Sequence, residues 1–277
     1  MRVSEVMTRD VKCAKIPGLT RDALELMKEL NTNSVPVVRK GTEEFVGMVS
    51  ANRILENPDE DQLALLIERD APTVSPDADL AEAARIMIDE NVRRLPVVKD
   101  GKLVGIITVR DILRRVIAAS EIDRPVGDFM RQHMIAVWEG TPLRVAAHLL
   151  RLSGFRVLPV IDESGRLVGK LSDTDIVRVS DVDISTTVSQ LTGKSESDSW
   201  AWDTEARIYI TKRELKLPDK PVREVMSQEV VTVLKSTPVK EVARMLGESR
   251  ENVAFVLGAS DELLGIVRDI DLLRAIF

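Results

Sequence analysis

The stretch 95–112, LPVVKDGKLVGIITVRDI, decides the fold of this chain, because its final octet closes a strand and opens a helix. Related octets begin at Gly47 (GMVSANRI), Gly105 (GIITVRDI), Gly169 (GKLSDTDI) and Gly265 (GIVRDIDL). Internal repetition fixes the architecture of a chain before any single propensity is considered. The sequence therefore predicts four copies of one structural unit, and function is expected where the copies differ.

An amphipathic helix precedes each octet, with apolar residues at i, i+3, i+4 and i+7. The four sets are Ala23/Leu26/Met27/Leu30, Leu80/Ala83/Ala84/Met87, Leu143/Ala146/Ala147/Leu150 and Val239/Val242/Ala243/Leu246. Asp77 and Asp79 surround the start of the second helix. Thr141-Pro142 and Thr237-Pro238 predict a capping hydroxyl ahead of a first-turn proline in the third and fourth copies.

Short apolar strands lie between each helix and its octet: VPVV (35–38), LPVV (95–98), LPVI (158–161) and AFVL (254–257). A further strand precedes the first helix, and another helix follows the octet. The unit is therefore β-α-β-β-α, and the fold class is α/β. Aromatic residues make up only 3% of the chain, so the cores must be aliphatic. A unit of this size buries too little surface to be stable alone, and each copy should pack against another.

These patterns divide the chain into four repeats and one insertion. The predicted repeats span 1–56, 70–120, 124–180 and 221–277. Residues 181–220 are inserted between copies three and four and contain a Ser/Thr-rich stretch. One interpretation is a β-hairpin that covers an apolar surface; the other is an arm that docks a partner protein.

Composition excludes several classes of function. The net charge of -6 gives no general reason to bind nucleic acid or an anionic membrane. One cysteine and two histidines exclude an internal disulfide and make a metal site improbable. We find no nucleophile–base set, no apolar run of membrane-spanning length and no signal peptide. The sequence predicts a cytoplasmic protein that is not an enzyme and requires no cofactor.

The octet pattern G-x-x-[ST]-x-x-D has chemistry suited to a nucleotide. Its hydroxyl lies near a helix N-terminus, where free N–H groups and the helix dipole favour a phosphate. An ionised aspartate offers only acceptor oxygens, which suit the paired hydroxyls of a ribose. The same spacing is also a capping box with purely local benefit. Within a repeated unit we favour the nucleotide interpretation.

The four copies differ at these two positions. Copy two has Thr108 and Asp111, and copy three has Ser172 and Asp175, so both are complete. Copy one pairs Ser50 with Arg53, and copy four pairs Arg268 with Asp271. Those two copies are weaker candidates, in which an arginine could reach a phosphate instead.

The repeated pattern, with motifs VSEVM (3–7), VGDFM (126–130) and VREVM (222–226) ahead of three copies, resembles the cystathionine β-synthase (CBS) domain family. The resemblance covers nearly the whole chain. It implies domains that pair through their sheets into two modules, which form a flat disc, and clefts that hold AMP, ADP, ATP or S-adenosylmethionine. The further ligand-binding residues that it implies are Arg94, Pro96, Val74, Arg156, Pro159, Val137 and, less strongly, Arg93.

The resemblance also implies a role in regulation. We expect copies one and two to pair, and three and four to pair, so that each module keeps one complete site. The expected protein is a homodimer that senses adenine nucleotides, as an energy sensor would, and signals to an unknown regulated partner. The alternative is an interaction scaffold with vestigial ligand sites that docks partners through residues 181–220.

Overall fold

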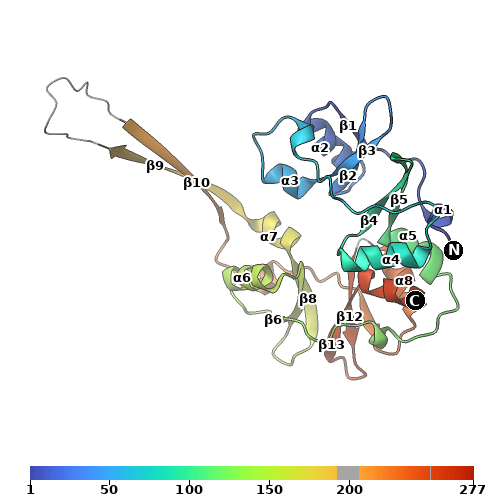
Figure 1. The fold of residues 1–277 in the computed structure, drawn as a ribbon. Helices are drawn as coiled ribbons and strands as arrows, with labels where there is room; N and C mark the ends of the chain where they lie inside the picture. Colours follow the sequence, from blue (N-terminus) through green and yellow to red (C-terminus); the bar gives the residue numbers. More distant parts are fainter. Residues whose placement is uncertain (192–205, 250) are drawn as a thin grey trace, which may run out of the picture. The chain divides into compact units, whose positions relative to one another are not determined.

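A computed structural model of the chain describes residues 1–191, 206–249 and 251–277 (Figure 1). It contains four small copies of one α/β unit, which confirms the fold class expected from the repeats. Within the described residues no helix combines the length and the apolar character that crossing a membrane requires.

The four copies follow the same order of elements. Copy one comprises β1 (Ala14–Ile16), α2 (Thr20–Glu29), β2 (Ser34–Arg39), β3 (Phe45–Ser50) and α3 (Ala51–Leu55). Copy two comprises α4 (Leu80–Asp89), β4 (Arg94–Lys99), β5 (Lys102–Thr108), α5 (Val109–Ile112) and the π-helical turn η2 (Leu113–Ile117). Copy three comprises β6 (Val137–Trp138), α6 (Leu143–Ser153), β7 (Val157–Ile161), β8 (Leu167–Ser172) and α7 (Asp173–Val179). Copy four comprises β11 (Thr232–Leu234), α8 (Val239–Glu248), β12 (Val253–Leu257), β13 (Leu263–Arg268) and the 3-10 helix η5 (Asp269–Ile276).

Each sheet has the same topology. In copies one, three and four the middle strand lies between a short first strand and the strand that leads into the octet. In copies one and three the first strand pairs parallel and the third pairs antiparallel with the middle one. In copy two the first strand is reduced to a single parallel bridge between Val74 and Val97. In copies one, two and three the octet therefore begins in an antiparallel strand, and every octet ends in a helix.

A short leading segment precedes each copy and packs against a different copy. The four segments contain α1 (Val3–Val6), η1 (Leu63–Leu65), η3 (Val126–Asp128) and η4 (Val222–Glu224). The side chains of Val3, Val6 and Met7 join the core of copy two, whereas Leu63, Leu66 and Ile67 join the core of copy one. The segments ahead of copies three and four are exchanged in the same way, because Val126 packs with copy four and Val222 with copy three.

The exchanged segments also cap the first helices. The N–H groups of Thr20, Leu80, Leu143 and Val239 donate to the carbonyls of Asp61, Met1, Lys220 and Arg124, respectively, at 2.8–3.0 Å. The prediction that Thr141 and Thr237 cap the helices of copies three and four is wrong, because Pro142 and Pro238 occupy the cap positions and make no side-chain hydrogen bond there. A backbone carbonyl from the leading segment takes the place of the hydroxyl. Asp79, one of the two aspartates at the start of α4, caps this helix through the N–H of Ala81 at 2.8 Å.

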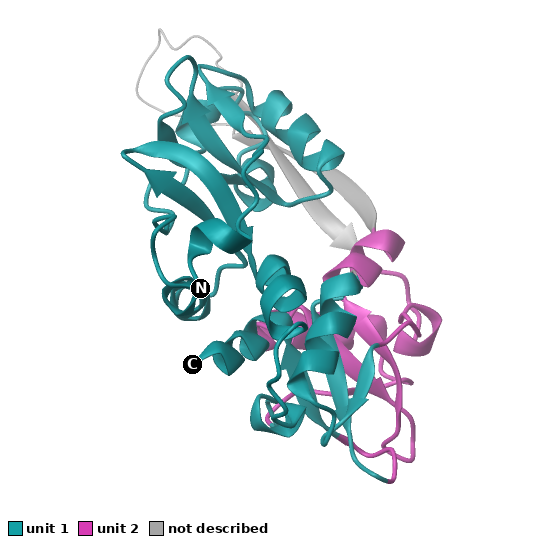
Figure 2. Cartoon of the chain, turned by 90° about the vertical axis from the view of Figure 1, so that its right-hand side faces the viewer, with its two compact units in different colours: residues 1–132, 231–259, 264–277 teal, residues 133–230, 260–263 magenta. Residues whose placement is uncertain are grey.

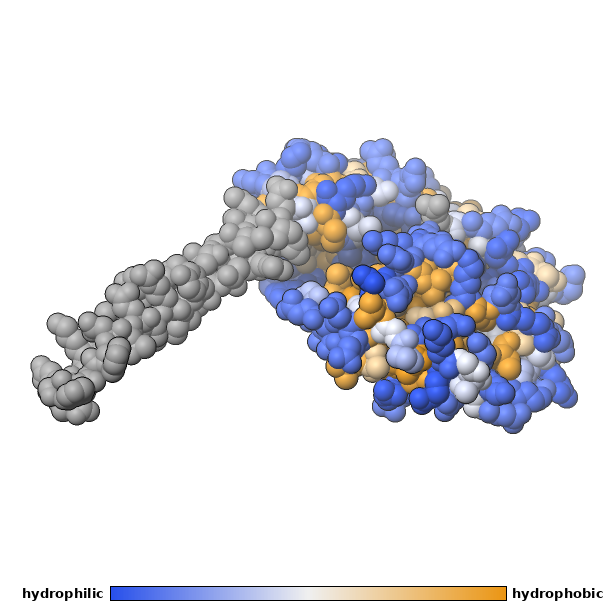
Figure 3. Space-filling view, turned by 90° about the horizontal axis from the view of Figure 1, so that it is seen from above, coloured by the Kyte–Doolittle hydropathy of each residue, from blue (hydrophilic) through white to orange (hydrophobic). Residues whose placement is uncertain are grey.

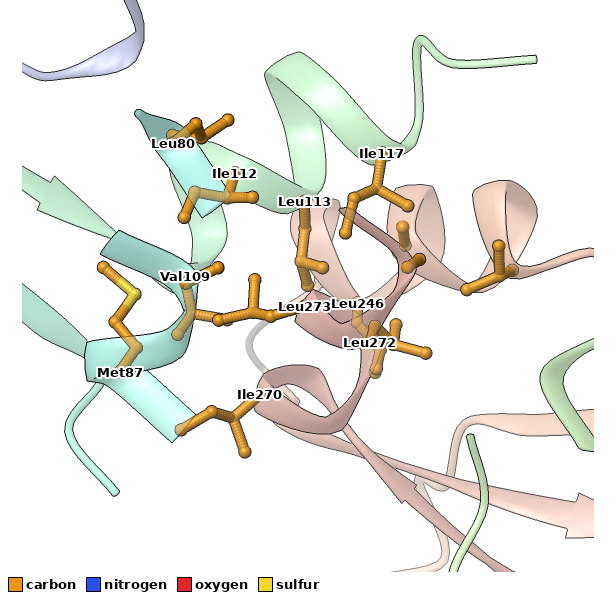
Figure 4. Close-up of a cluster of buried hydrophobic side chains, with 14 of the residues drawn as sticks. Leu80, Met87, Val109, Ile112, Leu113, Ile117, Leu246, Ile270, Leu272 and Leu273 are labelled. Carbon is orange, nitrogen blue, oxygen red and sulfur yellow. The ribbon is translucent and has the colours of Figure 1, made fainter. Parts of the chain in front are cut away.

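The structure divides into two compact units (Figure 2). Unit 1 comprises residues 1–132, 231–259 and 264–277, and unit 2 comprises residues 133–230 and 260–263. In unit 1 the final helices of copies two and four pack with α8 into one apolar cluster, in which Leu113, Ile117, Leu246 and Leu273 meet (Figure 4). Copy one has its own core in unit 1, and copy three has its own in unit 2.

Copies one and two are joined within unit 1 by backbone hydrogen bonds between their sheets. The N–H of Phe45 donates to Gly101, and the N–H of Leu103 donates to Glu43, at 2.9 and 3.2 Å. The expected pairing of copies one and two is therefore visible in unit 1.

The surface in Figure 3 is mainly hydrophilic, with small hydrophobic patches between the polar side chains.

Between copies three and four, β9 (Asp181–Leu191) and β10 (Ala206–Lys216) pair antiparallel. The sequence offered two interpretations of residues 181–220, a cover for an apolar surface and an arm that docks a partner. Both concern residues 192–205 and side chains that lie outside the described part of the chain.

Candidate functional site

Copy two has its octet hydroxyl and carboxylate in direct contact. Thr108 is the cap of α5, and its Oγ1 accepts a hydrogen bond from the N–H of Asp111 at 3.2 Å. Asp111 Oδ2 accepts from the Thr108 N–H at 3.0 Å and from its Oγ1 at 2.6 Å. The capping box foreseen as the alternative is therefore present. It occupies only one carboxylate oxygen, and the other lies 4.0 Å from Arg115 Nη2.

Copy three repeats this geometry in unit 2. Asp175 Oδ2 accepts from the N–H of Ser172 at 2.9 Å and from its Oγ at 2.6 Å. The second oxygen of Asp175 pairs with Arg178 Nη2 at 3.1 Å. The side chain of Asp175 is 7% exposed, whereas that of Arg178 is 63% exposed. Arg178 Nη2 also donates to the Val225 carbonyl at 3.0 Å. A ligand at this oxygen would therefore have to displace an exposed guanidinium from the carboxylate.

In copy four, by contrast, arginines occupy both carboxylate oxygens. Arg268 Nε and Nη2 donate to Asp271 Oδ2 and Oδ1, both at 2.9 Å. Arg131, from the leading segment ahead of copy three, donates its Nη2 to Oδ1 at 3.0 Å. Burial would raise the pKa of Asp271, but the hydrogen bonds from the two guanidinium groups outweigh it and lower that pKa below its usual value.

The copy-one octet lacks the carboxylate and has a different partner. Ser50 caps α3 by accepting from the Arg53 N–H at 3.4 Å. Its own hydroxyl donates to Glu68 Oε1 at 2.9 Å. Glu68 belongs to the leading segment ahead of copy two. The side chain of Arg53 is exposed. Among the described residues, no hydrogen bond joins this side chain to another candidate site residue.

The candidate arginines face different ways. Arg94 reaches copy one, where its Nη1 donates to Thr32 Oγ1 and to the Ser34 carbonyl, the latter at 2.8 Å. Burial, and secondarily the charge of Arg93, lowers the pKa of Arg94. Arg93 instead pairs with Asp269 of copy four at 2.6 Å. Arg94 therefore lies where copies one and two meet, and Arg93 is held on the side of copy four.

The remaining predicted residues are positioned by strands. Pro96 and Pro159 are buried in the middle strands β4 and β7. Val74 uses both of its backbone groups against β4, since its N–H donates to the Pro96 carbonyl and its carbonyl accepts from the N–H of Val98. Val137 pairs with Val160 in β6. Arg156 is exposed, and its carbonyl accepts from the Asp173 N–H at 3.4 Å.

The helix N-terminus of copy two has fewer free donors than the sequence argument assumed. The N–H of Val109 donates to the Arg93 carbonyl at 3.0 Å, and that of Asp111 donates to Thr108. A phosphate would therefore depend on side chains, because these two backbone donors already have protein acceptors. Among the described residues no group of three or more His, Cys, Asp or Glu side chains could hold a metal ion.

The octet glycines make room for the leading segments, whose backbone and side chains approach them closely. A Cβ at Gly105 would lie 2.6 Å from Met7 Sδ and 3.0 Å from the Thr8 carbonyl oxygen. A Cβ at Gly169 would lie 2.8 Å from the Ser227 carbonyl oxygen. Thr8 and Ser227 therefore border the two complete octets. The repeated V-x-x-[VF]-M motifs were the available signal, since each directly precedes one of these residues or its counterpart.

Comparison with known proteins supports the assignment of the repeats. The CBS domain family matches residues 3–60, 64–118, 126–181 and 222–277. A structure of an uncharacterized conserved protein from Pyrococcus horikoshii is 31% identical, with a TM-score of 0.71 and full coverage of both chains.

Protein MJ1225 from Methanocaldococcus jannaschii is similar along its length as well. In sequence it is 24% identical over 275 residues, which cover 92% of this chain and 91% of that protein. Its crystal structure, described as that of a proposed archaeal homologue of g-AMPK, has a TM-score of 0.69 at 21% identity and full coverage of both chains. An inosine-5'-monophosphate dehydrogenase from Thermoplasma acidophilum is 38% identical over 112 residues, which are 40% of this chain and only 22% of that enzyme.

Proposed function

Because the chain belongs to the cystathionine β-synthase (CBS) domain family, we propose that it is a regulatory protein that binds an adenosine-containing ligand at the octets of copies two and three. The ligand class is an adenine nucleotide (AMP, ADP or ATP) or S-adenosylmethionine. The observation that carries the proposal is the pair of complete octets. Asp111 and Asp175 are each fixed through one oxygen by the capping hydroxyl, and the other oxygen, which faces only an exposed arginine, would accept from a ribose hydroxyl.

Residues around copy two would supply the remaining contacts. Arg94 is paired in register with Thr108 across β4 and β5, so its guanidinium lies on the side where copies one and two meet. A guanidinium there would contact a phosphate. In copy three Arg156 has the corresponding role. The backbone beside Val74 and Val137 would border the adenine, with Pro96 and Pro159 shaping the strand next to it.

The proposed signal passes from the octet of copy two into the core of unit 1. Asp111 lies in α5, and η2 continues the same helical run into the apolar cluster shared by copies two and four. Arg115 of η2 also donates its Nη1 to the Val6 carbonyl of the leading segment at 2.8 Å. A ligand changes this packing only if it binds two conformations with different affinity. The proposal includes a homodimer and a regulated partner protein that reads the change.

Calorimetry on the full chain tests the ligand class, with AMP, ADP, ATP and S-adenosylmethionine as separate titrants. Asp111→Asn and Asp175→Asn keep the side-chain shape and remove the charge, so each should weaken one site. A hydrogen bond to a charged group contributes about 1.5–3 kcal/mol, which corresponds to a roughly 10- to 100-fold loss of affinity. Asp79→Asn is the matched control, because asparagine caps a helix as well as aspartate does.

Two results decide the proposal. Ligand binding that each octet variant weakens and Asp79→Asn leaves unchanged would support it. Thermal denaturation gives a second readout, since ligand at 100 times its dissociation constant stabilises a fold by about 2.7 kcal/mol. No binding of any of the four compounds at millimolar concentration would reject the proposal, and the search would move to protein partners of residues 181–220.

A further inference from the structure

One backbone pairing recurs in all four copies. One residue of each leading segment exchanges two hydrogen bonds with the residue after an octet glycine, at N–O distances of 2.7–3.0 Å. The pairs are Thr8 with Ile106, Glu68 with Met48, Arg131 with Ile266 and Ser227 with Lys170. In each copy one residue of the leading segment therefore lies beside the octet at the same position.

The geometry of a β-ladder directs this residue toward the site. Side chains two apart in a strand share a face, so the octet hydroxyl two residues after the paired position lies on the same face. A diagonal neighbour of this kind is within reach of a long side chain. Copy one shows the contact, because Glu68 accepts from Ser50, two residues after Met48. Copy four shows it as well, because Arg131 lies beside the pair formed by Arg268 and Asp271.

In copy four the contact satisfies the carboxylate completely. The side chain of Asp271 is only 3% exposed, and both of its oxygens accept from guanidinium groups at 2.9–3.3 Å. A ribose hydroxyl carries no charge of its own, so its bond to the carboxylate lacks the attraction between opposite charges that each guanidinium contributes. A ligand at this octet would have to replace the stronger bonds with weaker ones and would leave two arginines without their carboxylate.

Copies two and three have a small hydroxyl residue at the same position. Thr8 and Ser227 carry no charge, and their short side chains do not span the distance that Arg131 spans. Asp111 and Asp175 keep one oxygen for which the described residues show only an exposed arginine, Arg115 or Arg178. The complete octets and the small residues therefore occur together, and so do the incomplete octets and the charged residues.

We propose that this residue of the leading segment selects which octets bind ligand: Arg131 acts as an internal ligand of Asp271 and closes copy four, whereas Thr8 and Ser227 leave copies two and three open. Glu68 has the equivalent effect in copy one, where it engages the Ser50 hydroxyl and places a negative charge next to it. The inference rests on the proposed function, because it concerns the same octets and the same class of ligand.

The test is the stoichiometry of AMP binding to the full chain, measured by calorimetry. Arg131→Ser combined with Arg268→Ser gives copy four the residues of copy three. It should add one binding equivalent per chain, and a further Asp271→Ala should remove that equivalent. The matched control is Arg39→Ser combined with Arg124→Ser, which removes two exposed arginines and should leave the stoichiometry of the parent chain.

The reciprocal change closes an open copy. Ser227→Arg supplies Asp175 with a second guanidinium and should weaken AMP binding to copy three more than tenfold, while copy two keeps its affinity. If Arg131→Ser combined with Arg268→Ser does not fold, Ser227→Arg still tests the proposal. Circular dichroism and the melting temperature identify such a failure.

The outcomes separate this inference from the proposed function. A parent chain that binds AMP, together with folded variants that neither gain nor lose a site, overturns the inference and leaves the function in place. A parent chain that binds none of AMP, ADP, ATP and S-adenosylmethionine, together with a double variant that binds one equivalent of AMP, rejects the function and supports the closing of copy four by Arg131. Absence of binding of all four compounds in both chains overturns both.

Discussion

Replacing Gly47 with alanine tests whether the octet glycine is required by the exchanged leading segment. A Cβ at this position would lie 2.4 Å from the Glu68 carbonyl oxygen and 2.6 Å from Ile67 Cγ2. Real Cβ contacts are longer, so the leading segment has to move. The movement would break the two hydrogen bonds between Met48 and Glu68, at 2.8 and 3.0 Å.

The magnitude follows from two contributions. Overpacking of a well-packed site costs about 1–3 kcal/mol. A left-handed backbone costs an ordinary residue about 1–2 kcal/mol, and Gly47 has a φ of +150°. We expect Gly47→Ala to lower the free energy of unfolding by about 2–5 kcal/mol, the sum of the two contributions. Gly41→Ala is the matched control, because Gly41 has a φ of +91° with no atom within 4 Å of an added Cβ. It should show only the backbone contribution.

Thermal unfolding and amide hydrogen exchange measure the two effects separately. One kcal/mol shifts the melting temperature of a domain of 150–250 residues by about 2–4 °C, so the two variants should be distinguishable. The amides of Met48 and Glu68 should lose protection in Gly47→Ala and keep it in Gly41→Ala. Equal melting temperatures for the two variants, with unchanged protection at Met48 and Glu68, would refute the reasoning.

Three further predictions concern stability. Leu273→Ala should lower the free energy of unfolding by about 2–5 kcal/mol, because this side chain is 0% exposed between copies two and four. Urea denaturation checks it against Leu234→Ala, whose side chain is 51% exposed, and similar losses would contradict the assigned core. Asp79→Ala should cost about 1 kcal/mol as a lost helix cap, and a loss as large as that of Leu273→Ala would point to a different role. The lowered pKa of Asp271 means that the unfolded chain binds its proton more tightly. The contribution of the Asp271 carboxylate to the free energy of unfolding is full above the unfolded pKa of about 3.9, and it is lost as pH falls through the folded pKa. Urea titrations from pH 6 to pH 2 should therefore show a steeper loss for the parent chain than for Asp271→Asn, and parallel curves would contradict the assigned pair.

The elements that depend on local periodicity could be predicted from the sequence. The apolar stripe Leu80/Ala83/Ala84/Met87 is buried in α4, and the strands around Pro96 and Pro159 form as expected. The contact between Thr108 and Asp111 also follows from spacing alone, since three residues separate a helix cap from its partner. These features need only interactions between neighbours in the chain.

Features that depend on distant segments could not be predicted. Thr141 and Thr237 fail as caps because carbonyls from Lys220 and Arg124 arrive from elsewhere in the chain. The different directions of Arg93 and Arg94 reflect the alternation of side chains along extended backbone, but the sequence does not say which face meets copy one. The role of Arg131 was missed for the same reason, because 140 residues separate it from Asp271.

The exchange of leading segments restricts how a protein of this kind can grow or shrink during evolution. Copy two is completed by the residues ahead of copy one, and copy one by the residues ahead of copy two. A gene duplication or deletion that covered one copy would leave an apolar groove without its segment and a segment without its groove. The smallest heritable step that keeps every copy complete is therefore a pair, and the number of copies should stay even.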